Sequence, residues 1–277
     1  MCKARCRLLE WAILALAASA PAPAGEFVYL HVIPVTASAD AVAGAPGASD
    51  PPSFRVSMTG PEEGFAPESL AALGASVVDG QAVFTLGAYP RLGGEVTGAH
   101  RAATFVVDFD EPEVRQLSAR LVEEHGESPA FADLIRFTGD AISVKTMARG
   151  WDVASRIARS GEGDCTEHAV LLTALARAAG LPARVVVGFV LVWSGGSVDA
   201  YGHAWTEIHD GTDWRRVDGT AIDRQATVRY VPMAAVTDEG PGYQFHLFAQ
   251  LASTWPRHVE LDRVDEGAGK LSAPTSR

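Results

Sequence analysis

The sequence has few cysteines, a deficit of basic residues and no long apolar stretch after its N-terminus. Among 277 residues only Cys2, Cys6 and Cys165 are cysteines, which excludes a fold held together by several disulfides. Lysine and arginine number 23 against 34 aspartates and glutamates, for a formal net charge of −11. This charge argues against nucleic acid or an anionic membrane as the main partner. No later segment reaches the roughly 18 apolar residues of a transmembrane helix.

The N-terminus has the pattern of a secretory signal peptide. Three basic residues among the first seven precede an apolar run over 11–18, and small residues at 22–24 offer a cleavage site. The sequence therefore predicts export to the periplasm or the medium, with residues 1–24 removed and no stable membrane insertion afterwards. An uncleaved membrane anchor is the alternative. After cleavage Cys165 would be the one remaining cysteine, in a compartment where an unpaired thiol is a liability unless it is buried or used.

The composition divides the rest of the chain into two regions and a tail. Short apolar runs separated by Gly and Pro predict a small β-rich region over 25–109. Within it, the Ala/Gly/Pro/Ser-rich stretch at 37–53 is expected to be a flexible loop. Helical spacing followed by β-type segments predicts an α+β domain over 110–260, and 261–277 are expected to form a flexible tail.

The patterns within the second region place Cys165 at the start of a helix. Asp164 is a suitable N-cap, and Gly180 with the following proline ends the helix. Other elements are predicted from apolar spacing and proline positions: helices over 111–126, 128–146 and 151–160, an interior strand over 184–192 and a loop over 193–200.

A tight hairpin is predicted where Asp210 and Gly211 separate two alternating segments. If these two residues form the turn, His203 lies directly opposite Asp218 on the neighbouring strand. The imidazole could then donate a hydrogen bond to the carboxylate. A register slip of one residue would separate the two side chains.

Cys165, His203 and Asp218 together suit nucleophilic catalysis. A free cysteine has a pKa near 8.5, so only about 3% of it is thiolate at pH 7. A helix N-terminus and a nearby imidazolium both favour the thiolate, so we expect a lowered pKa for Cys165. Asp218 would fix the tautomer of His203, and the backbone N–H of Cys165 could donate to an oxyanion.

The chain resembles the core of transglutaminase-like proteins, relatives of papain-type thiol enzymes, in two stretches, GDCTEHAVLLTALARAAGLPARVVVGFV and GHAWTEIHDGTDWRRVDGTA. The shared pattern is Gly-x-Cys opening a helix, Gly-x-Pro-x-Arg entering a strand, His-Ala-Trp, and Trp-x-x-x-Asp, over roughly residues 140–222. The resemblance implies an α+β papain-like fold of helices packed on an antiparallel sheet. It also implies a Cys165, His203 and Asp218 triad that transfers an acyl group from an amide through a thioester. Gly219 departs from the family pattern, because many members have proline there; we expect little effect on chemistry.

Some of these residues have alternative roles. The indole of Trp151 is a candidate second oxyanion donor, although packing is the more common role of a tryptophan. Cys165 with His168, His203 and His209 could bind a metal, but without a second compact ligand pair the zinc signal is weak. We therefore expect no cofactor and no metal. The favoured function is a peptidase or amidase acting on a protein or peptide; crosslinking by acyl transfer and a catalytically idle peptide-binding module are the alternatives.

Overall fold

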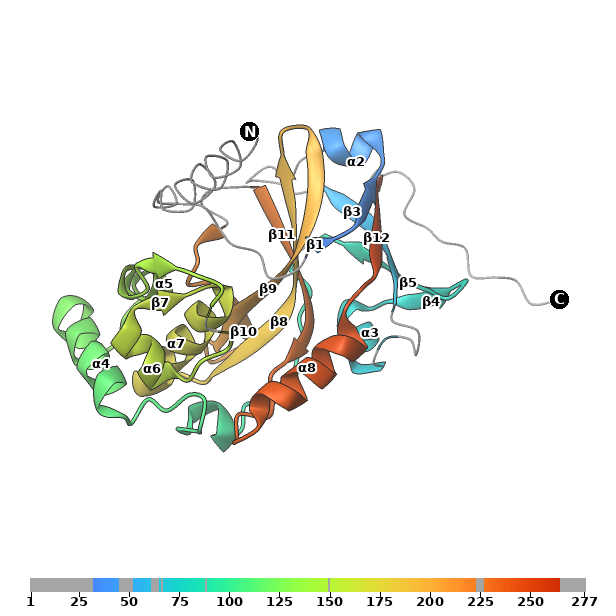
Figure 1. Ribbon diagram of the computed structural model, residues 1–277. Helices are drawn as coiled ribbons and strands as arrows, with labels where there is room; N and C mark the ends of the chain where they lie inside the picture. Colours follow the sequence, from blue (N-terminus) through green and yellow to red (C-terminus); the bar gives the residue numbers. More distant parts are fainter. Residues whose placement is uncertain are drawn as a thin grey trace, which may run out of the picture.

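The computed structural model describes residues 32–44, 52–60, 65, 67–87, 89–148, 150–222 and 227–264. The predicted signal peptide therefore lies outside the described residues. Within them, two five-stranded sheets are accompanied by helices on both sides of a central β-hairpin (Figure 1). The α+β class predicted from the sequence is confirmed. None of the described helices combines the length and apolar character needed to cross a bilayer.

The first sheet is antiparallel and has the order β1-β9-β8-β11, with β10 also paired to β9. Its strands are β1 (Val32–Ile33), β8 (Ala183–Ser194), β9 (Ser197–His209), β10 (Trp214–Val217) and β11 (Thr227–Ala235). The second sheet has the order β2-β12-β3-β5-β4. Its strands are β2 (Val35–Ala37), β3 (Ser53–Thr59), β4 (Ser76–Val78), β5 (Gln81–Leu86) and β12 (His258–Val264).

The helices fall mainly in the middle of the chain. They are α2 (Ala39–Ala43), α3 (Pro67–Leu73), the 3-10 turn η1 (Gly98–Arg101), α4 (Pro112–His125), α5 (Phe131–Ala141), α6 (Ala154–Ser160), α7 (Cys165–Ala178) and α8 (Tyr243–Thr254). A short parallel pair, β6 (Val144–Lys145) and β7 (Glu162–Gly163), joins the segments before α6 and α7. Helices α4 to α7 gather beside one end of the β8–β9 hairpin, and the second sheet lies beside the other (Figure 1).

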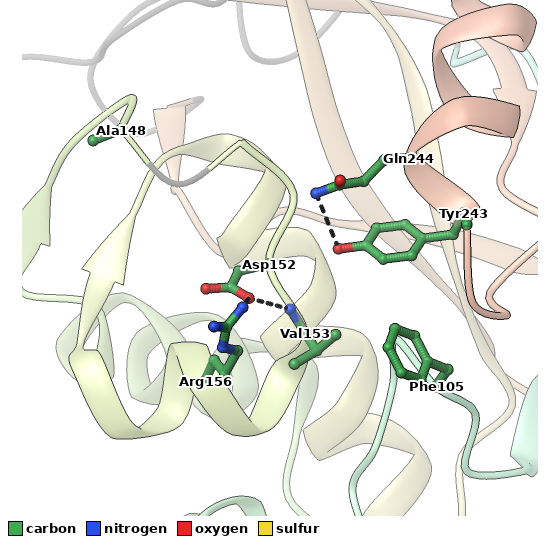
Figure 2. Close-up of a pocket in the computed structure, with 8 residues that line it drawn as sticks. Phe105, Ala148, Asp152, Val153, Arg156, Tyr243 and Gln244 are labelled. Carbon is green, nitrogen blue, oxygen red and sulfur yellow. Dashed lines mark hydrogen bonds and ion pairs between the residues drawn. The ribbon is translucent and has the colours of Figure 1, made fainter.

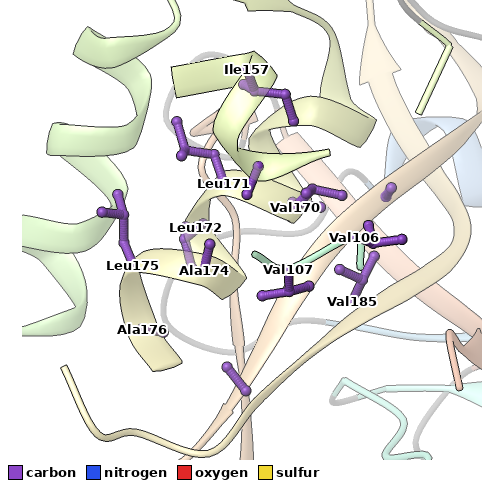
Figure 3. Packing of buried hydrophobic residues seen from close by; sticks show 14 of the residues in the cluster. Val106, Val107, Ile157, Val170, Leu171, Leu172, Ala174, Leu175, Ala176 and Val185 are labelled. Carbon is purple, nitrogen blue, oxygen red and sulfur yellow. The ribbon is translucent and has the colours of Figure 1, made fainter. Parts of the chain in front are cut away.

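Helix α7 is buried over almost its whole length. Its residues from Cys165 to Arg177 are all buried, because α4, α5 and α6 cover it and strands β8 and β9 pack against it. Leu171, Leu172 and Leu175 meet Ile157 and valines of the neighbouring segments (Figure 3). A helix that is apolar on all sides is expected at such a central position. The first residue of α7 therefore lies inside the protein rather than at its surface.

Strand β8 contributes to both cores through one face. Alternate residues of a strand point to the same side. Val185 and Val187 face the helical core, whereas Phe189 and Leu191 on the same side face the second sheet. The predicted interior strand is confirmed and is longer than expected, since the segment predicted as a loop over 193–200 continues the pairing around a hairpin tip.

The predicted tail and the predicted flexible loop both contain regular structure. Strand β12 extends into the segment 261–277 and pairs with β2 and β3, and Leu261 is buried. The tail prediction is wrong for these first residues because alternating apolar side chains fill the second core. The stretch 37–53 contains α2, which is capped by the hydroxyl of Ser38 and buries Ala41.

Two further elements differ from the prediction. The apolar run at 103–109 forms no strand, because its backbone bonds to other segments: Val106 donates to the carbonyl of Glu239 and accepts from Ala154. The predicted helix over 128–146 is shorter and ends at residue 141. Beyond it, the chain turns into β6, where the N–H of Val144 donates to the carbonyl of Gly161.

Candidate active site

The N-terminus of α7 has a complete capping box. Asp164 is the N-cap, as predicted, and its Oδ1 accepts from the backbone N–H and the hydroxyl of Thr166, both at 2.8 Å. In return, Glu167 Oε2 accepts the N–H of Asp164 at 3.0 Å. These bonds satisfy donors that a helix start leaves free. They also fix the position of Cys165, the first residue of the helix, which is 5% exposed.

Gly163 is required by this cap. A Cβ at Gly163 would lie 2.3 Å from Cβ of Glu167, which is closer than two non-bonded carbon atoms can approach. Because Glu167 must fold back over this position to reach Asp164, only glycine fits. The Gly-x-Cys pattern therefore has a direct steric explanation in this structure.

His203 and Asp218 form a buried hydrogen-bonded pair. His203 Nε2 lies 2.8 Å from Asp218 Oδ2, and both side chains are 2% exposed. Asp218 Oδ2 also accepts from the hydroxyl of Tyr230 at 2.7 Å, and Oδ1 accepts from the N–H and hydroxyl of Thr220. Burial alone would raise the pKa of Asp218, but the charge of His203 and these hydrogen bonds hold it below its usual range.

The hairpin that carries this pair has a different register from the predicted one. Trp214 pairs with His209, so the turn residues are Gly211 and Thr212 rather than Asp210 and Gly211. Gly211 has φ +100°, which suits the first central position of a type II′ turn. The carboxylate of Asp210 instead caps the turn and accepts the N–H and the hydroxyl of Thr212.

The His203–Asp218 contact survives because the register error is two residues and not one. A shift of two keeps every side chain on the same face of the sheet. Asp218 then follows the end of β10 and reaches His203 diagonally, which neighbouring strands allow for long side chains. The contact between His203 and Asp218 was predicted correctly, but the prediction that the two residues lie directly opposite each other is wrong.

The structure brings Cys165 next to this pair. The backbone of Ala204, the residue after His203, hydrogen-bonds to the Cys165 thiol, and the charge of Asp218 acts on it. Because Nε2 of His203 is hydrogen-bonded to Asp218, Nδ1 is the ring nitrogen left for proton exchange with the thiol. The residue predicted as nucleophile therefore lies against the strand that carries the predicted base, and the charge of the predicted orienting carboxylate acts on it.

The predicted lowering of the Cys165 pKa is wrong. Burial is the largest cause and raises the pKa of the thiol well above its ordinary value, and the charge of Asp164 adds to this effect. The hydrogen bond from Ala204 opposes both but does not outweigh them. Position at a helix N-terminus favours an anion, yet here the cap itself is an anion. The resting thiol is therefore protonated at neutral pH.

Asp164 is itself an unusual carboxyl. Burial and the charge of Glu167 raise its pKa to about 6. Its Oδ2 has no hydrogen-bond partner among the residues that the structure describes, which is costly for an ionised oxygen and acceptable for a protonated one. Acidification to below pH 6 therefore removes a negative charge beside Cys165.

His168 does not join a metal site. Its Nδ1 donates to the backbone carbonyl of Asp164 at 2.5 Å, and Nε2 accepts from Nζ of Lys145 at 2.6 Å. Burial and the charge of Lys145 lower its pKa to about 4. In the described part of the chain no three His, Cys, Asp or Glu side chains gather as a metal would require. Both ring nitrogens of His168, one member of the metal-binding alternative, are thus taken up by neighbouring groups.

Trp151 lies close to the start of α7 in an unfavourable backbone conformation. It is 5% exposed and has φ +64°, a region that bulky residues rarely adopt. Its carbonyl accepts from the hydroxyl of Tyr243 and from Nε2 of Gln244, both in α8. Glu167 Oε1 accepts the N–H of Asp152 at 3.1 Å, so one carboxylate connects this segment to the N-cap of α7.

Sequence reasoning missed the contributions of α8 and of Glu167. Tyr243 and Gln244 are more than ninety residues from Trp151, and no spacing pattern connects them. Glu167 could have been found, because an N-cap followed three residues later by Glu is a capping-box signature. Its second bond, to Asp152, has no signal in the sequence.

A buried ion pair joins Glu207 of β9, the strand that also carries His203, to Arg184 of β8. Arg184 bonds to Glu207 Oε2 through Nε at 2.9 Å and Nη2 at 2.6 Å. The hydroxyl of Tyr89 donates to Glu207 Oε1 at 2.7 Å and accepts from the indole N–H of Trp205 at 2.9 Å. The guanidinium also lies 4.0 Å from the ring centroid of Trp214. The arginine of the Gly-x-Pro-x-Arg pattern is therefore part of a closed network.

The α+β fold thus places a cysteine at a helix start and a His–Asp pair on the adjoining sheet. Residues 116–219 match the sequence model of the transglutaminase-like superfamily. This segment runs from α4 to the residue after Asp218. The chain therefore contains a transglutaminase-like core, and the resemblance inferred from the sequence is confirmed.

Solved structures that align with part of this chain include a candidate cysteine protease from Cytophaga hutchinsonii, with 18% identity over 60% of this chain and 55% of that one, at a TM-score of 0.41. The periplasmic domain of TgpA from Pseudomonas aeruginosa bound to ethylmercury aligns at 21% identity over 52% of this chain and 57% of that one, with TM-score 0.34. Without ethylmercury, the same domain aligns at 20% identity over 50% and 52%, with TM-score 0.33. The aligned region thus spans little more than half the length of each structure. Comparison with curated proteins gave no match.

Proposed function

We propose that the protein is a thiol-dependent acyl-transfer enzyme that cleaves peptide or isopeptide amide bonds. Cys165 is the nucleophile, His203 the general base and Asp218 the carboxylate that orients the imidazole. The observation that carries this proposal is the buried His203–Asp218 bond of 2.8 Å next to the thiol at the start of α7. The transglutaminase-like core at 116–219 supports it.

The first step forms a thioester. The Cys165 sulfur attacks the carbonyl carbon of the amide while its proton passes to Nδ1 of His203. Because burial keeps the resting thiol protonated, this transfer accompanies the attack, as it does for a serine nucleophile. Asp218 stabilises the imidazolium. The backbone N–H of Cys165 and the indole of Trp151 are the proposed donors to the oxyanion.

The second step releases the acyl group. When the tetrahedral intermediate collapses, the C–N bond breaks and the imidazolium of His203 gives its proton to the leaving amine. Water then attacks the thioester with His203 as base, and the acid product leaves with the thiol restored. We propose hydrolysis rather than crosslinking because water needs no binding site of its own, whereas an acceptor amine does.

Export of the protein is a separate proposal. It rests on the basic and apolar N-terminus with small residues at 22–24. Fusion of residues 1–30 to a reporter that works only outside the cytoplasm tests it. Secretion with loss of residues 1–24 is expected, and retention of the fusion in the cell would contradict it.

Acyl transfer to Cys165 can be tested before the substrate is known. p-Nitrophenyl acetate should release p-nitrophenolate in a burst of one equivalent, with one acetyl group located on Cys165 by peptide mass mapping. Cys165→Ser should lose the burst. An idle peptide-binding module on the same fold would show no difference between the two proteins.

A further inference from the structure

A pocket of about 590 Å³ opens beside the segment that carries Trp151 (Figure 2). Three segments far apart in the sequence supply its walls, contributing among others Phe105, Asp152, Arg156, Tyr243 and Gln244. The transglutaminase-like core ends before α8 begins, so part of this pocket comes from outside the matched region.

One wall of the pocket is bonded directly to the candidate active site. Tyr243 and Gln244 donate to the carbonyl of Trp151. The N–H of Asp152 donates to the same Glu167 carboxylate that accepts the N–H of Asp164. A molecule held in this pocket therefore lies against the segment that adjoins the start of α7.

The apolar side of the pocket is formed by two aromatic rings. Phe105 and Tyr243 have ring centroids 6.2 Å apart with an interplanar angle of 51°, and the two rings lie next to each other on one side of the pocket (Figure 2). Phe105 is 53% exposed, so part of its ring is accessible to a bound molecule. These rings offer a surface to an apolar side chain.

The charged side of the pocket offers a guanidinium and not a free carboxylate. Arg156 is paired to Asp152 Oδ1 at 3.3 Å through Nη1, but its side chain remains 68% exposed. The carboxylate of Asp152 is 9% exposed and also accepts the N–H of Val153 at 3.0 Å. Arginine has five N–H donors in a planar fork that matches a carboxylate. In a chain of net charge −11, this exposed cation selects for an anionic group.

We propose that this pocket is a substrate subsite for an apolar peptide residue accompanied by a carboxylate. The apolar group packs against the rings of Phe105 and Tyr243, and the carboxylate binds Arg156. The carboxylate could be the free C-terminus of a peptide or an acidic side chain next to the apolar residue. The link from this pocket to cleavage rests on the proposed function, because only then is the bound peptide a substrate of Cys165.

Binding can be measured with three small probes in NMR titrations of the full chain: N-acetylphenylalanine, its amide, and N-acetyl-aspartyl-phenylalaninamide. At least one acid should bind about tenfold more tightly than the uncharged amide, as expected for a charge-assisted hydrogen bond. The acid that binds better identifies a terminal or a side-chain carboxylate as the preferred source. Arg156→Gln should abolish the preference.

Arg159→Gln is the matched control. Arg159 lies in the same helix and its side chain is 67% exposed, but it pairs with Glu113 and does not line the pocket. This variant should keep the preference for the acid. Equal binding of all three probes, or a preference that survives Arg156→Gln, would overturn the proposed subsite.

A second experiment separates the subsite from the catalytic proposal. Chloroacetyl-phenylalanine probes with zero to three glycine spacers should label Cys165 fastest at one spacer length, about tenfold faster than their amides. The rate with plain chloroacetamide reports on the thiol alone. If chloroacetamide labelling is independent of His203, the catalytic proposal fails whatever the spacer series shows. If it depends on His203 but acid and amide probes react equally at every length, the subsite fails.

Discussion

Strand β9 takes part in two buried pairs of hydrogen-bonded side chains that differ in one chemical property. His203, Trp205 and Glu207 alternate along the strand and therefore lie on one face of the sheet. His203 pairs with Asp218, and Glu207 pairs with Arg184. All four side chains are nearly inaccessible to solvent.

The partner determines what each pair can do. Glu207 is bonded by Nε and Nη2 of Arg184 and by the hydroxyl of Tyr89, so this pair can only hold its neighbours in place. The imidazole of His203 uses one ring nitrogen for Asp218 and keeps a second that can accept a proton, which a guanidinium lacks. The same degree of burial therefore accompanies a structural pair at one position and, in the proposed mechanism, a pair that exchanges a proton four residues away.

The largest effect should come from removing the proton acceptor. His203→Ala is expected to lower the rate of Cys165 acetylation by p-nitrophenyl acetate by about 10²–10⁴, the usual contribution of a general base. Stopped-flow kinetics measures the rate, and circular dichroism checks that the variant is folded. An acetylation rate unchanged in a folded variant would remove the distinction between the two pairs.

Disruption of the Arg184–Glu207 pair should lower the stability of the protein and leave the chemistry at Cys165 largely unchanged. Glu207→Gln leaves the charge of Arg184 buried without its partner, which costs about 3–5 kcal/mol of unfolding free energy. Urea denaturation measures this loss, and the acetylation rate per folded molecule should change little. Glu113→Gln is the control, because it breaks the exposed Arg159–Glu113 pair and should barely alter stability.

A second buried imidazole sharpens the comparison through its pH dependence. Burial and Lys145 lower the pKa of His168 from 6.5 to about 4, so between these values the unfolded chain binds more protons than the folded one. Stability should therefore rise with pH over this window and be lost on acidification, by about 3 kcal/mol at most. Urea denaturation from pH 4 to 7 should show a smaller slope in His168→Gln. An equal slope in both proteins would contradict the assignment.

Substitution of Asp164 tests whether its negative charge helps to keep the Cys165 thiol protonated at rest. Asp164→Asn keeps an oxygen to cap Thr166 but removes the negative charge next to Cys165. Alkylation of Cys165 should shift to lower pH and become several-fold faster at pH 7. Below pH 6 the wild type should approach the variant, because its own Asp164 is then protonated. A shift to higher pH in the variant would show that the charge is not the cause.

The smallest effect is expected at Tyr230. Tyr230→Phe removes one of the donors to Asp218, and a single hydrogen bond contributes about 0.5–1.5 kcal/mol. The acetylation rate should fall only a few-fold, with its pH profile shifted slightly. A loss as large as that of His203→Ala would mean that Tyr230 takes part in proton transfer.

Local features of the fold and site could be predicted from the sequence, but contacts between distant segments could not. The cap at Asp164 and the strand at 184–192 depend on a few adjacent residues, and the structure confirms both. The bonds from α8 to Trp151 join segments with no shared pattern. The prediction of a lowered pKa for Cys165 was wrong for a related reason. The position of a residue in a helix is a local property, whereas its burial depends on the whole fold.

The role of His203 as base for Cys165 is tested most directly by alkylation of that thiol with iodoacetamide as a function of pH, in the wild type and in His203→Ala, with labelling mapped to Cys165 by mass spectrometry. We expect at least about tenfold faster labelling of the wild type at pH 7, with the two rates converging at high pH, where the thiol ionises without help. Identical profiles across the whole pH range would contradict it.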